Sequence, residues 1–214
     1  MEKKIKMYKK YIKRVLDILI AILLLPLLLI ITIFIAPIIY FTDKGNVFYN
    51  ANRLGKNGKI FKMYKFRTMK ENCEDIRNED GSTYNGRDDP RLTKIGKIIR
   101  KASIDEMPQI INVLKGDMSF IGPRPDLPEH ISKYEDKEKR KLEASPGITG
   151  YNQAYFRNSI EWKDRIKNDI YYIDNLSFKL DLKIFFKTLK TILKEENVYI
   201  ESKNNEKEQP YVRK

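Results

Sequence analysis

Two adjacent acids and two arginines in the middle of the chain have the types and spacing needed for phosphate chemistry. Asp105 and Glu106 are neighbours, and Arg124 follows them in a Pro-Arg-Pro sequence that stiffens the backbone around it. Carboxylate oxygens are ligands that Mg²⁺ prefers, and the arginine fork binds phosphate oxygens. These residues could hold a divalent ion and a phosphate together, with Arg100 as a second phosphate ligand.

Each of these residues also has an ordinary structural interpretation. Ser103 and Glu106 have the spacing of a capping box, in which the acids would complement the positive end of a short helix. Pro108 complicates that interpretation, because it disfavours helical dihedrals at the preceding residue and suits the first turn of a helix itself. Arg124 could equally be a residue of a surface turn.

An uncharged run over residues 18–42 must position the polar part of the chain relative to a membrane. Its 25 residues would extend about 37 Å as a helix, more than the roughly 30 Å hydrocarbon core of a bilayer. Pro26 interrupts helical hydrogen bonding, so a kink is expected. Seven Lys or Arg lie in residues 1–17 and eight in residues 43–70. This balance suits a re-entrant helix broken at Pro26, with both ends on one leaflet, and leaves a kinked single-pass anchor as the alternative.

The remaining patterns predict an α+β fold that is mainly helical. Asn57-Gly58, between two aromatic-rich segments, is a strong hairpin turn signal. The predicted elements are a β-hairpin over 46–69, a mobile loop over 71–90, an amphipathic helix over 91–103, a helix over 109–114 that stops at Gly116, a charged helix over 130–142, a helix over 159–173 and an amphipathic helix over 178–196.

The last of these helices has an apolar stripe that could either pack on the core or lie in the bilayer interface. Its residues are Leu182, Phe185, Phe186, Leu189, Ile192 and Leu193. The chain is therefore expected to have three regions: a basic arm and the membrane helix over residues 1–42, a polar domain over residues 43–200, and a polar, disordered tail over residues 201–214.

Composition limits the classes of function. The 42 Lys and Arg against 29 Asp and Glu leave a net charge of +13, which indicates an anionic partner such as nucleic acid, phospholipid or a phosphorylated substrate. One Cys and one His exclude a disulfide framework, a Cys-rich zinc site and paired-histidine catalysis.

A membrane-tethered nucleic-acid-binding module, using the cations and aromatics of "KIFKMYKFR", is the main rival to an enzyme. An anchored scaffold is a third alternative.

The order of the motifs resembles a known family. An apolar run with an internal proline is followed by "YKFRTM" (64–69), "GKIIRKASIDEMPQIINVLKGDMSFIGPRP" (96–125) and "PGITG" (146–150). This order is similar to the bacterial sugar transferase family of monotopic phosphoglycosyl transferases, and the likeness extends from about residue 11 to residue 193. It is greatest to the smallest members, which consist of the catalytic unit alone.

The resemblance implies a specific reaction. Such enzymes transfer a phosphosugar from a UDP-sugar to undecaprenyl phosphate, releasing UMP, on the cytoplasmic face of the bacterial inner membrane. This is the first membrane step in assembling an O-antigen, capsule, exopolysaccharide or glycoprotein glycan. The resemblance also implies that the membrane helix in residues 1–42 is re-entrant and that residues 43–200 form a cytoplasmic catalytic domain. By the family pattern, Asp105 is the nucleophile and forms a covalent phosphosugar intermediate. Glu106 is its partner, and Mg²⁺ bound at Asp105 offsets the charge of the diphosphate.

Further positions follow from the same resemblance. Arg100 and Arg124 would bind phosphate, with Lys65 and Asp169 as additional active-site residues. Without the resemblance, Lys65 would be one cation of a solvated hairpin face, and Asp169 a helix-surface acid. The family often has Ser immediately before the helix-breaking proline, whereas this chain has Leu25. The expected partners are therefore a UDP-sugar, undecaprenyl phosphate and membrane lipids, with no nucleic acid; the sugar would be read by residues 151–162.

Overall fold

The computed structural model describes residues 7–77, 84, 86, 89–156, 160–193 and 211–212. A π-helical turn over Tyr8–Ile12 leads into α2 (Lys13–Asp43), which is followed by β1 (Phe48–Leu54) and β2 (Ile60–Phe66). The mainly helical α+β composition predicted from the sequence is confirmed. The later elements, in chain order, are β3 (Ile76–Arg77), α3 (Lys94–Lys101), η3 (Ile104–Glu106), α4 (Gln109–Lys115), β4 (Ser119–Ile121), η4 (Pro128–Lys133), η5 (Glu138–Glu143), β5 (Gly147–Thr149), α5 (Tyr151–Tyr155), α6 (Trp162–Asp174), α7 (Phe178–Leu193) and β6 (Tyr211–Val212).

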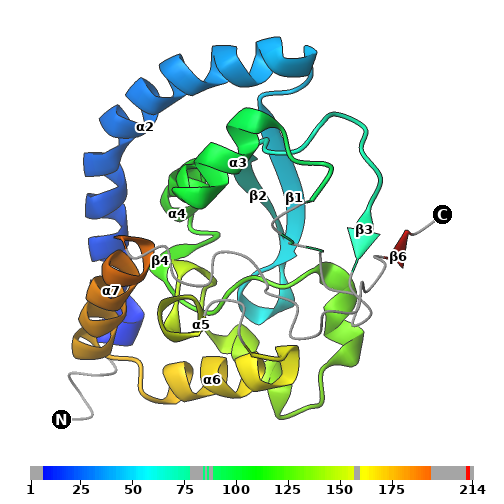
Figure 1. The fold of residues 1–214 in the computed structure, drawn as a ribbon. Helices are drawn as coiled ribbons and strands as arrows, with labels where there is room; N and C mark the ends of the chain where they lie inside the picture. Colours follow the sequence, from blue (N-terminus) through cyan, green and yellow to red (C-terminus); the bar gives the residue numbers. More distant parts are fainter. Residues whose placement is uncertain are drawn as a thin grey trace.

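The long helix α2 bends around the rest of the molecule (Figure 1). It is helical without interruption from Lys13 to Asp43, and both Pro26 and Pro37 lie inside it. The break predicted at Pro26 is therefore not confirmed, because the chain bends while remaining helical. Proline removes one backbone donor and pushes on the preceding turn, which favours curvature of a helix that packs on a domain.

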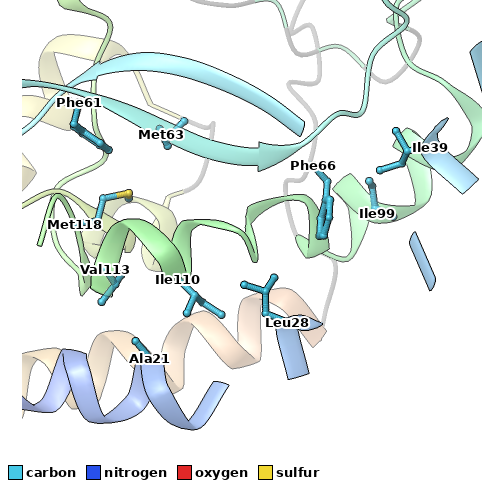
Figure 2. Close-up of a cluster of buried hydrophobic side chains, with 10 residues drawn as sticks. All are labelled: Ala21, Leu28, Ile39, Phe61, Met63, Phe66, Ile99, Ile110, Val113 and Met118. Carbon is cyan, nitrogen blue, oxygen red and sulfur yellow. The ribbon is translucent and has the colours of Figure 1, made fainter. Parts of the chain in front are cut away.

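One face of α2 packs on the domain, and the opposite face is open. Ala21 and Leu28 belong to the same buried cluster as Ile110 and Val113 of α4 (Figure 2). On the opposite face, Leu23 is 77% exposed. By length and apolar composition, α2 is long enough to cross a membrane, and most of it is not buried in the molecule.

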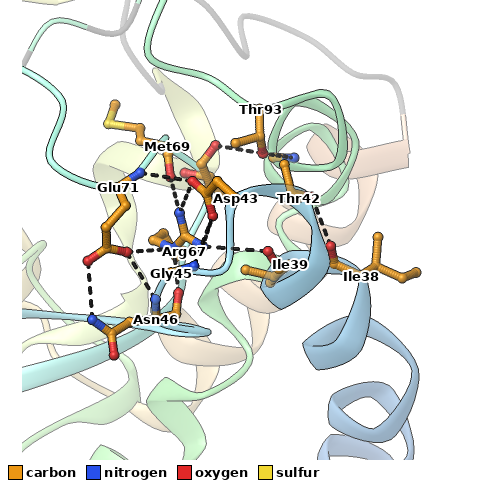
Figure 3. A network of polar contacts seen from close by, with 12 residues as sticks. Ile38, Ile39, Thr42, Asp43, Gly45, Asn46, Arg67, Met69, Glu71 and Thr93 are labelled. Carbon is orange, nitrogen blue, oxygen red and sulfur yellow. Dashed lines mark hydrogen bonds and ion pairs between the residues drawn. The ribbon is translucent and has the colours of Figure 1, made fainter.

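Both ends of α2 are tied to the same globular domain. Near its beginning, Arg14 donates to the backbone carbonyl of Leu114 at 2.9 Å, and the Asp17 carboxylate accepts from the backbone N–H of Phe120 at 3.1 Å. At its end, the Asp43 carboxylate pairs with both terminal nitrogens of Arg67 at 2.6 Å (Figure 3). The helix therefore leaves the domain and returns to it.

The predicted hairpin is confirmed. Strands β1 and β2 pair antiparallel, with Phe48 opposite Phe66 and Leu54 opposite Ile60. In the turn, Asn57 has φ 56° and Gly58 has φ 76°, which is the left-handed backbone that Asn and Gly adopt most readily. This turn sets the register and therefore the direction of each side chain along β2.

Parallel pairing of β4 with β5 holds the Pro-Arg-Pro turn that follows β4. Ser119 lies opposite Gly147, and Ile121 opposite Thr149. A Cβ added at Gly147 would lie 2.1 Å from the backbone nitrogen of Gly122, so these two backbones pack with no room for a side chain. The "PGITG" segment thus supports the turn that carries Arg124.

Replacing Gly147 by Ala should remove this support. The new methyl group would meet backbone atoms that cannot move aside, including the Thr149 carbonyl oxygen at 2.3 Å. We expect a loss of about 3 kcal/mol or more in the free energy of unfolding, as for other overpacked backbone contacts, measured by thermal or denaturant unfolding. Ile148→Val, in the same strand, is the control and should cost about 1 kcal/mol. Equal stability of the two variants would contradict the close packing.

Two predictions for the C-terminal half need correction or completion. The helix predicted over 130–142 is instead two short 3₁₀ helices, η4 and η5, separated by residues 134–137, because Tyr134 takes an extended backbone conformation. Most of the stripe predicted on α7 points outward: Leu182, Phe185, Phe186 and Leu189 are each at least 43% exposed, whereas Ile192 is half-buried. The side chain of Leu193 lies outside the described residues. The core contact of α7 is made by another face, which includes the fully buried Ile184.

Several predicted features fall partly outside the described residues. The loop over 71–90 is described only in part, and there Ile76–Arg77 pairs antiparallel with Tyr211–Val212 of the tail. Of the stretch 151–162, residues 157–159 are not described, and neither is most of the tail over 201–214. The domain boundaries at residues 42 and 200 remain predictions.

Candidate active site

A residue in the left-handed backbone conformation separates α3 from the turn that carries the two adjacent acids. Helix α3 ends at Lys101, Ser103 has φ 57°, and the 3₁₀ turn η3 then carries Asp105 and Glu106. In the described part of the chain, the Ser103 side chain makes no capping hydrogen bond, so the capping-box interpretation is wrong. The acids lie on a tight turn and face the hairpin instead.

Lys65 of β2 joins the two acids. Its Nζ lies 2.5 Å from Glu106 Oε1 and 4.0 Å from Asp105 Oδ2, so Glu106 receives a hydrogen bond while Asp105 lies beyond hydrogen-bond distance. The Lys65 side chain is 17% exposed, which shows that it is not part of a solvated basic face. Asp105 is buried, with 6% of its surface exposed.

The two arginines approach the acids from different elements. Arg124 Nη1, on the turn after β4, lies 3.9 Å from Glu106 Oε1, and the Arg124 side chain is about half exposed. Arg100, in the last turn of α3, donates from Nη2 to Thr68 Oγ1 at 2.8 Å. A half-exposed arginine beside a partly buried carboxylate is placed to meet an anion that arrives from solvent.

Burial and charge act in opposite directions on the two acids. Burial raises the pKa of Asp105 to about 6, although the charges of Lys65, Arg100 and Arg124 act to lower it. Burial also acts to raise the pKa of Glu106, but Lys65 and Arg124 outweigh it, so this pKa falls below its ordinary value. Two adjacent carboxyls with pKa values moved apart by their surroundings are typical of catalytic sites.

A buried asparagine fixes α4 against the strand that carries Lys65. The Asn112 side chain is fully buried, accepts from the backbone N–H of Tyr64 at 2.9 Å and donates to the carbonyl of Lys62 at 2.8 Å. It therefore links β2 to the helix that begins directly after the acids. The sequence signal was available, because Asn112 interrupts the otherwise apolar run "IINVL", but sequence reasoning missed its role.

Asp169 lies in a separate buried cluster. Its carboxylate pairs with Lys141 Nζ at 3.0 Å and accepts from the Asn152 amide at 2.8 Å. Lys141 also donates to Asp126 at 2.6 Å, and Asp126 is two residues after Arg124. Asp169 is only 1% exposed, so it is not a helix-surface acid, and none of the contacts described for it joins it to Asp105.

The acids suit Mg²⁺ only together with substrate oxygens. Among the described residues no group of three or more acidic, His or Cys side chains could hold a metal. However, Mg²⁺ is commonly bound by one or two carboxylates plus substrate phosphates. The buried Asp105 carboxylate, whose charge is only partly compensated by Lys65, fits such a role.

Comparisons with known proteins identify the family of this chain. The chain matches the bacterial sugar transferase family over residues 8–195. It is 45% identical over 189 residues to a galactosyl transferase of Streptococcus agalactiae, a match that covers 85% of this chain and 42% of the relative. It is 43% identical over 187 residues to an uncharacterized sugar transferase of Bacillus subtilis, covering 87% of this chain and 90% of that relative.

A third relative carries a more specific name. It is the UDP-N-acetylgalactosamine-undecaprenyl-phosphate N-acetylgalactosaminephosphotransferase of Aeromonas hydrophila, 40% identical over 190 residues, covering 86% of this chain and 44% of the relative. The chain thus spans less than half the length of two of these relatives. The family match, by contrast, includes α2, the paired acids, both arginines and Lys65. The chain therefore belongs to the bacterial sugar transferase family.

Proposed function

We propose that this protein is a Mg²⁺-dependent phosphoglycosyl transferase that moves a phosphosugar from a UDP-sugar to undecaprenyl phosphate and releases UMP. The reaction would be the first membrane step of glycan assembly. The observation that carries the proposal is the pairing of the buried Asp105 with the partly buried Glu106, bridged by Lys65 and faced by Arg124. The names of relatives, which include an undecaprenyl-phosphate N-acetylgalactosaminephosphotransferase, support the substrate classes.

The reaction has two displacement steps at one phosphorus atom. First, a carboxylate oxygen of Asp105 attacks the β-phosphorus, a new oxygen–phosphorus bond forms, and the bond to the bridging oxygen breaks, so that UMP leaves with the electron pair. Then an oxygen of undecaprenyl phosphate attacks the same phosphorus and displaces Asp105 as a free carboxylate. Both steps conserve charge without an added proton donor.

Each neighbouring residue has a task in this scheme. Lys65 holds Glu106 at 2.5 Å and leaves Asp105 free of a short hydrogen bond, which preserves its nucleophilicity. Arg100 and Arg124 would bind the diphosphate oxygens and neutralise the charge that develops on them. A Mg²⁺ ion held by Asp105 and the diphosphate would supply further charge neutralisation.

The direct test is UMP release. Purified protein with undecaprenyl phosphate and Mg²⁺ should release UMP from at least one member of a UDP-sugar panel. The panel starts with UDP-galactose and UDP-N-acetylgalactosamine, because the names of relatives refer to these sugars. Removing Mg²⁺ with EDTA should stop the release, and adding Mg²⁺ back should restore it. A panel that gives no UMP with either sugar or any other member would count against the proposal.

We further propose that α2 enters and leaves the membrane on the cytoplasmic side of the inner membrane. The contacts of Arg14 and Asp17 at one end and of Asp43 at the other all lead to the same domain. A helix that spans the bilayer would place its ends about 30 Å apart on opposite sides, where one domain could not hold both. The outward apolar stripe of α7 would add an interfacial contact.

Cysteine accessibility checks this topology. In a Cys73→Ser background, single cysteines at Lys10 and Lys56 should both react with a membrane-impermeant reagent from the cytoplasmic side of inverted vesicles. Intact spheroplasts should leave both unlabelled. Labelling of the two positions from opposite sides would establish a single-pass anchor instead.

The alternative function, a nucleic-acid-binding module, has weaker support than the proposed transferase. Two of the cations in "KIFKMYKFR" are committed to internal ion pairs, Lys65 with Glu106 and Arg67 with Asp43. The Arg67 side chain is 7% exposed, so it offers little surface to a phosphate backbone. Salt-sensitive binding of nucleic acid that does not depend on Asp105 would favour this alternative.

A further inference from the structure

The end of β2 carries three polar side chains that reach three different parts of the molecule. Lys65 reaches Glu106, Arg67 reaches the end of α2, and Thr68 reaches Arg100. All belong to the "YKFRTM" segment, of which the proposed function uses only Lys65. Thr68 is the one that contacts a proposed phosphate ligand.

Thr68 is held firmly in place. It is 6% exposed, and its backbone carbonyl accepts from the backbone N–H of Thr93 at 3.0 Å and from the Thr93 hydroxyl at 3.3 Å. A Cβ added at Gly96 would lie 1.9 Å from that same carbonyl oxygen. The first turn of α3 is therefore pressed directly against Thr68, and neither can shift without the other.

The Thr68 hydroxyl accepts one hydrogen bond from the far end of α3. Arg100 Nη2 donates to Thr68 Oγ1 at 2.8 Å. A guanidinium carries five N–H donors in a rigid plane, so fixing one nitrogen orients the others. The charge of Arg100 also acts to lower the pKa of both Asp105 and Glu106, so this end of α3 lies within electrostatic reach of the acid pair.

We infer that Thr68 is a positioning residue for Arg100: its hydroxyl fixes the guanidinium in the orientation that receives the diphosphate of the donor. Thr68 itself touches no reacting atom. This inference rests on the proposed function, because it assigns a task to a residue that supports one of the proposed phosphate ligands. A long arginine side chain loses conformational entropy when it binds a ligand. Because the buried Thr68 hydroxyl already holds the Arg100 guanidinium, part of that entropy is lost before the ligand binds, and the affinity for the ligand is higher.

Thr68→Val and Thr68→Ser separate the hydroxyl from the rest of the side chain. Val keeps the β-branched shape and removes the hydrogen bond, whereas Ser keeps the hydroxyl. We expect Thr68→Val to lower kcat/KM for the UDP-sugar about tenfold, the size of one hydrogen bond to a charged group, mainly through a higher KM for the UDP-sugar. Thr68→Ser should stay within about twofold of the original protein.

A double-mutant cycle distinguishes positioning from general stability. Once Arg100 is replaced by Met, Thr68→Val should cause no further loss of kcat/KM, because the hydroxyl acts only through the guanidinium. An equal loss in both backgrounds, or no loss in either, would overturn the inference. If Thr68→Val folds poorly, Thr68→Ala provides the same comparison. Absence of UMP release by the unmodified protein would overturn the proposed function itself, whereas normal turnover with an unaffected Thr68→Val variant would overturn only the role of Thr68.

Discussion

Turnover should fall by roughly four orders of magnitude or more when Asp105 is replaced by Asn, the size of effect seen when an enzyme loses its nucleophile. An amide oxygen at this position keeps the shape of the side chain but cannot displace UMP from the β-phosphorus. UMP release under saturating UDP-sugar and undecaprenyl phosphate is the measurement. With radiolabelled donor sugar and no lipid acceptor, the unmodified protein should retain label covalently and the Asn variant should not.

The same substitution should not destabilise the fold. Burial raises the pKa of Asp105 to about 6, above the ordinary value near 4, so the folded state holds its proton more tightly than the unfolded chain. A raised carboxyl pKa means that ionisation at pH 7 costs stability, and that this cost disappears as the pH falls through 6 towards 4. Asp105→Asn should therefore unfold, without Mg²⁺, at the same temperature as the original protein or a higher one.

Asp136→Asn is the control for Asp105→Asn. Asp136 is an exposed acid that pairs with Lys139 at 2.8 Å, and its replacement should change neither turnover nor the unfolding temperature. Full turnover by Asp105→Asn would rule out Asp105 as the nucleophile. A large drop in its unfolding temperature would instead assign Asp105 a structural role.

Loss of the Arg67 side chain should loosen the end of α2. In Figure 3 the guanidinium lies at the centre of a polar cluster, which contains the Asp43 carboxylate at 2.6 Å, the Met69 carbonyl at 3.1 Å and Glu71 at 3.4 Å. Arg67→Met would remove the guanidinium from these acceptors and leave Asp43 with only the backbone donors of Gly45 and Glu71. We expect a loss of about 2–4 kcal/mol in the free energy of unfolding, somewhat below the range for fully buried pairs, because a quarter of the Asp43 side chain is exposed.

An exposed ion pair supplies the comparison for Arg67. Arg140 pairs with Asp174 at 2.5 Å, but both side chains are more than 40% exposed, so Arg140→Met should cost less than about 1 kcal/mol. Thermal unfolding of both variants in the same detergent or lipid disc measures the difference. Equal stability of the two would contradict a structural role for the Arg67 cluster. Arg67→Lys should fall between them, since an ammonium group cannot pair with both oxygens of Asp43 in the same way.

Local chemistry made part of the fold predictable. The turn at Asn57-Gly58 and the end of α4 at Gly116, which has φ 91°, depend on residues that favour a left-handed backbone. The hydrophobic periodicity of α3 and α4 lies within single helices. Such features are decided by neighbours in the sequence, so the hairpin and both helices were predicted close to their observed bounds.

The other features of the fold and of the candidate site depend on contacts between residues that are distant in the sequence. Asp169 pairs with Lys141, and Lys141 connects it to Asp126 near the Pro-Arg-Pro turn; these contacts could not be predicted from the sequence, and the role of Asp169 at the active site stays a prediction. The apolar stripe of α7 had two interpretations from the sequence, and only the packing of Ile184 into the core showed that the stripe faces outward. Periodicity identifies an apolar face, but it does not say what that face contacts.

The sequence by itself indicated which residues could do chemistry: residue types and spacing pointed to the adjacent acids and the two arginines, and the family resemblance added the lysine of "YKFRTM". The tertiary structure decided that Lys65 bridges Asp105 and Glu106, and that α2 bends through Pro26 and returns to the domain it left. The physical reason is that a carboxylate acquires its pKa, and a helix its curvature, from burial and contacts supplied by other segments. Those contacts exist only once β2, α3, α4 and the turn after β4 have come together.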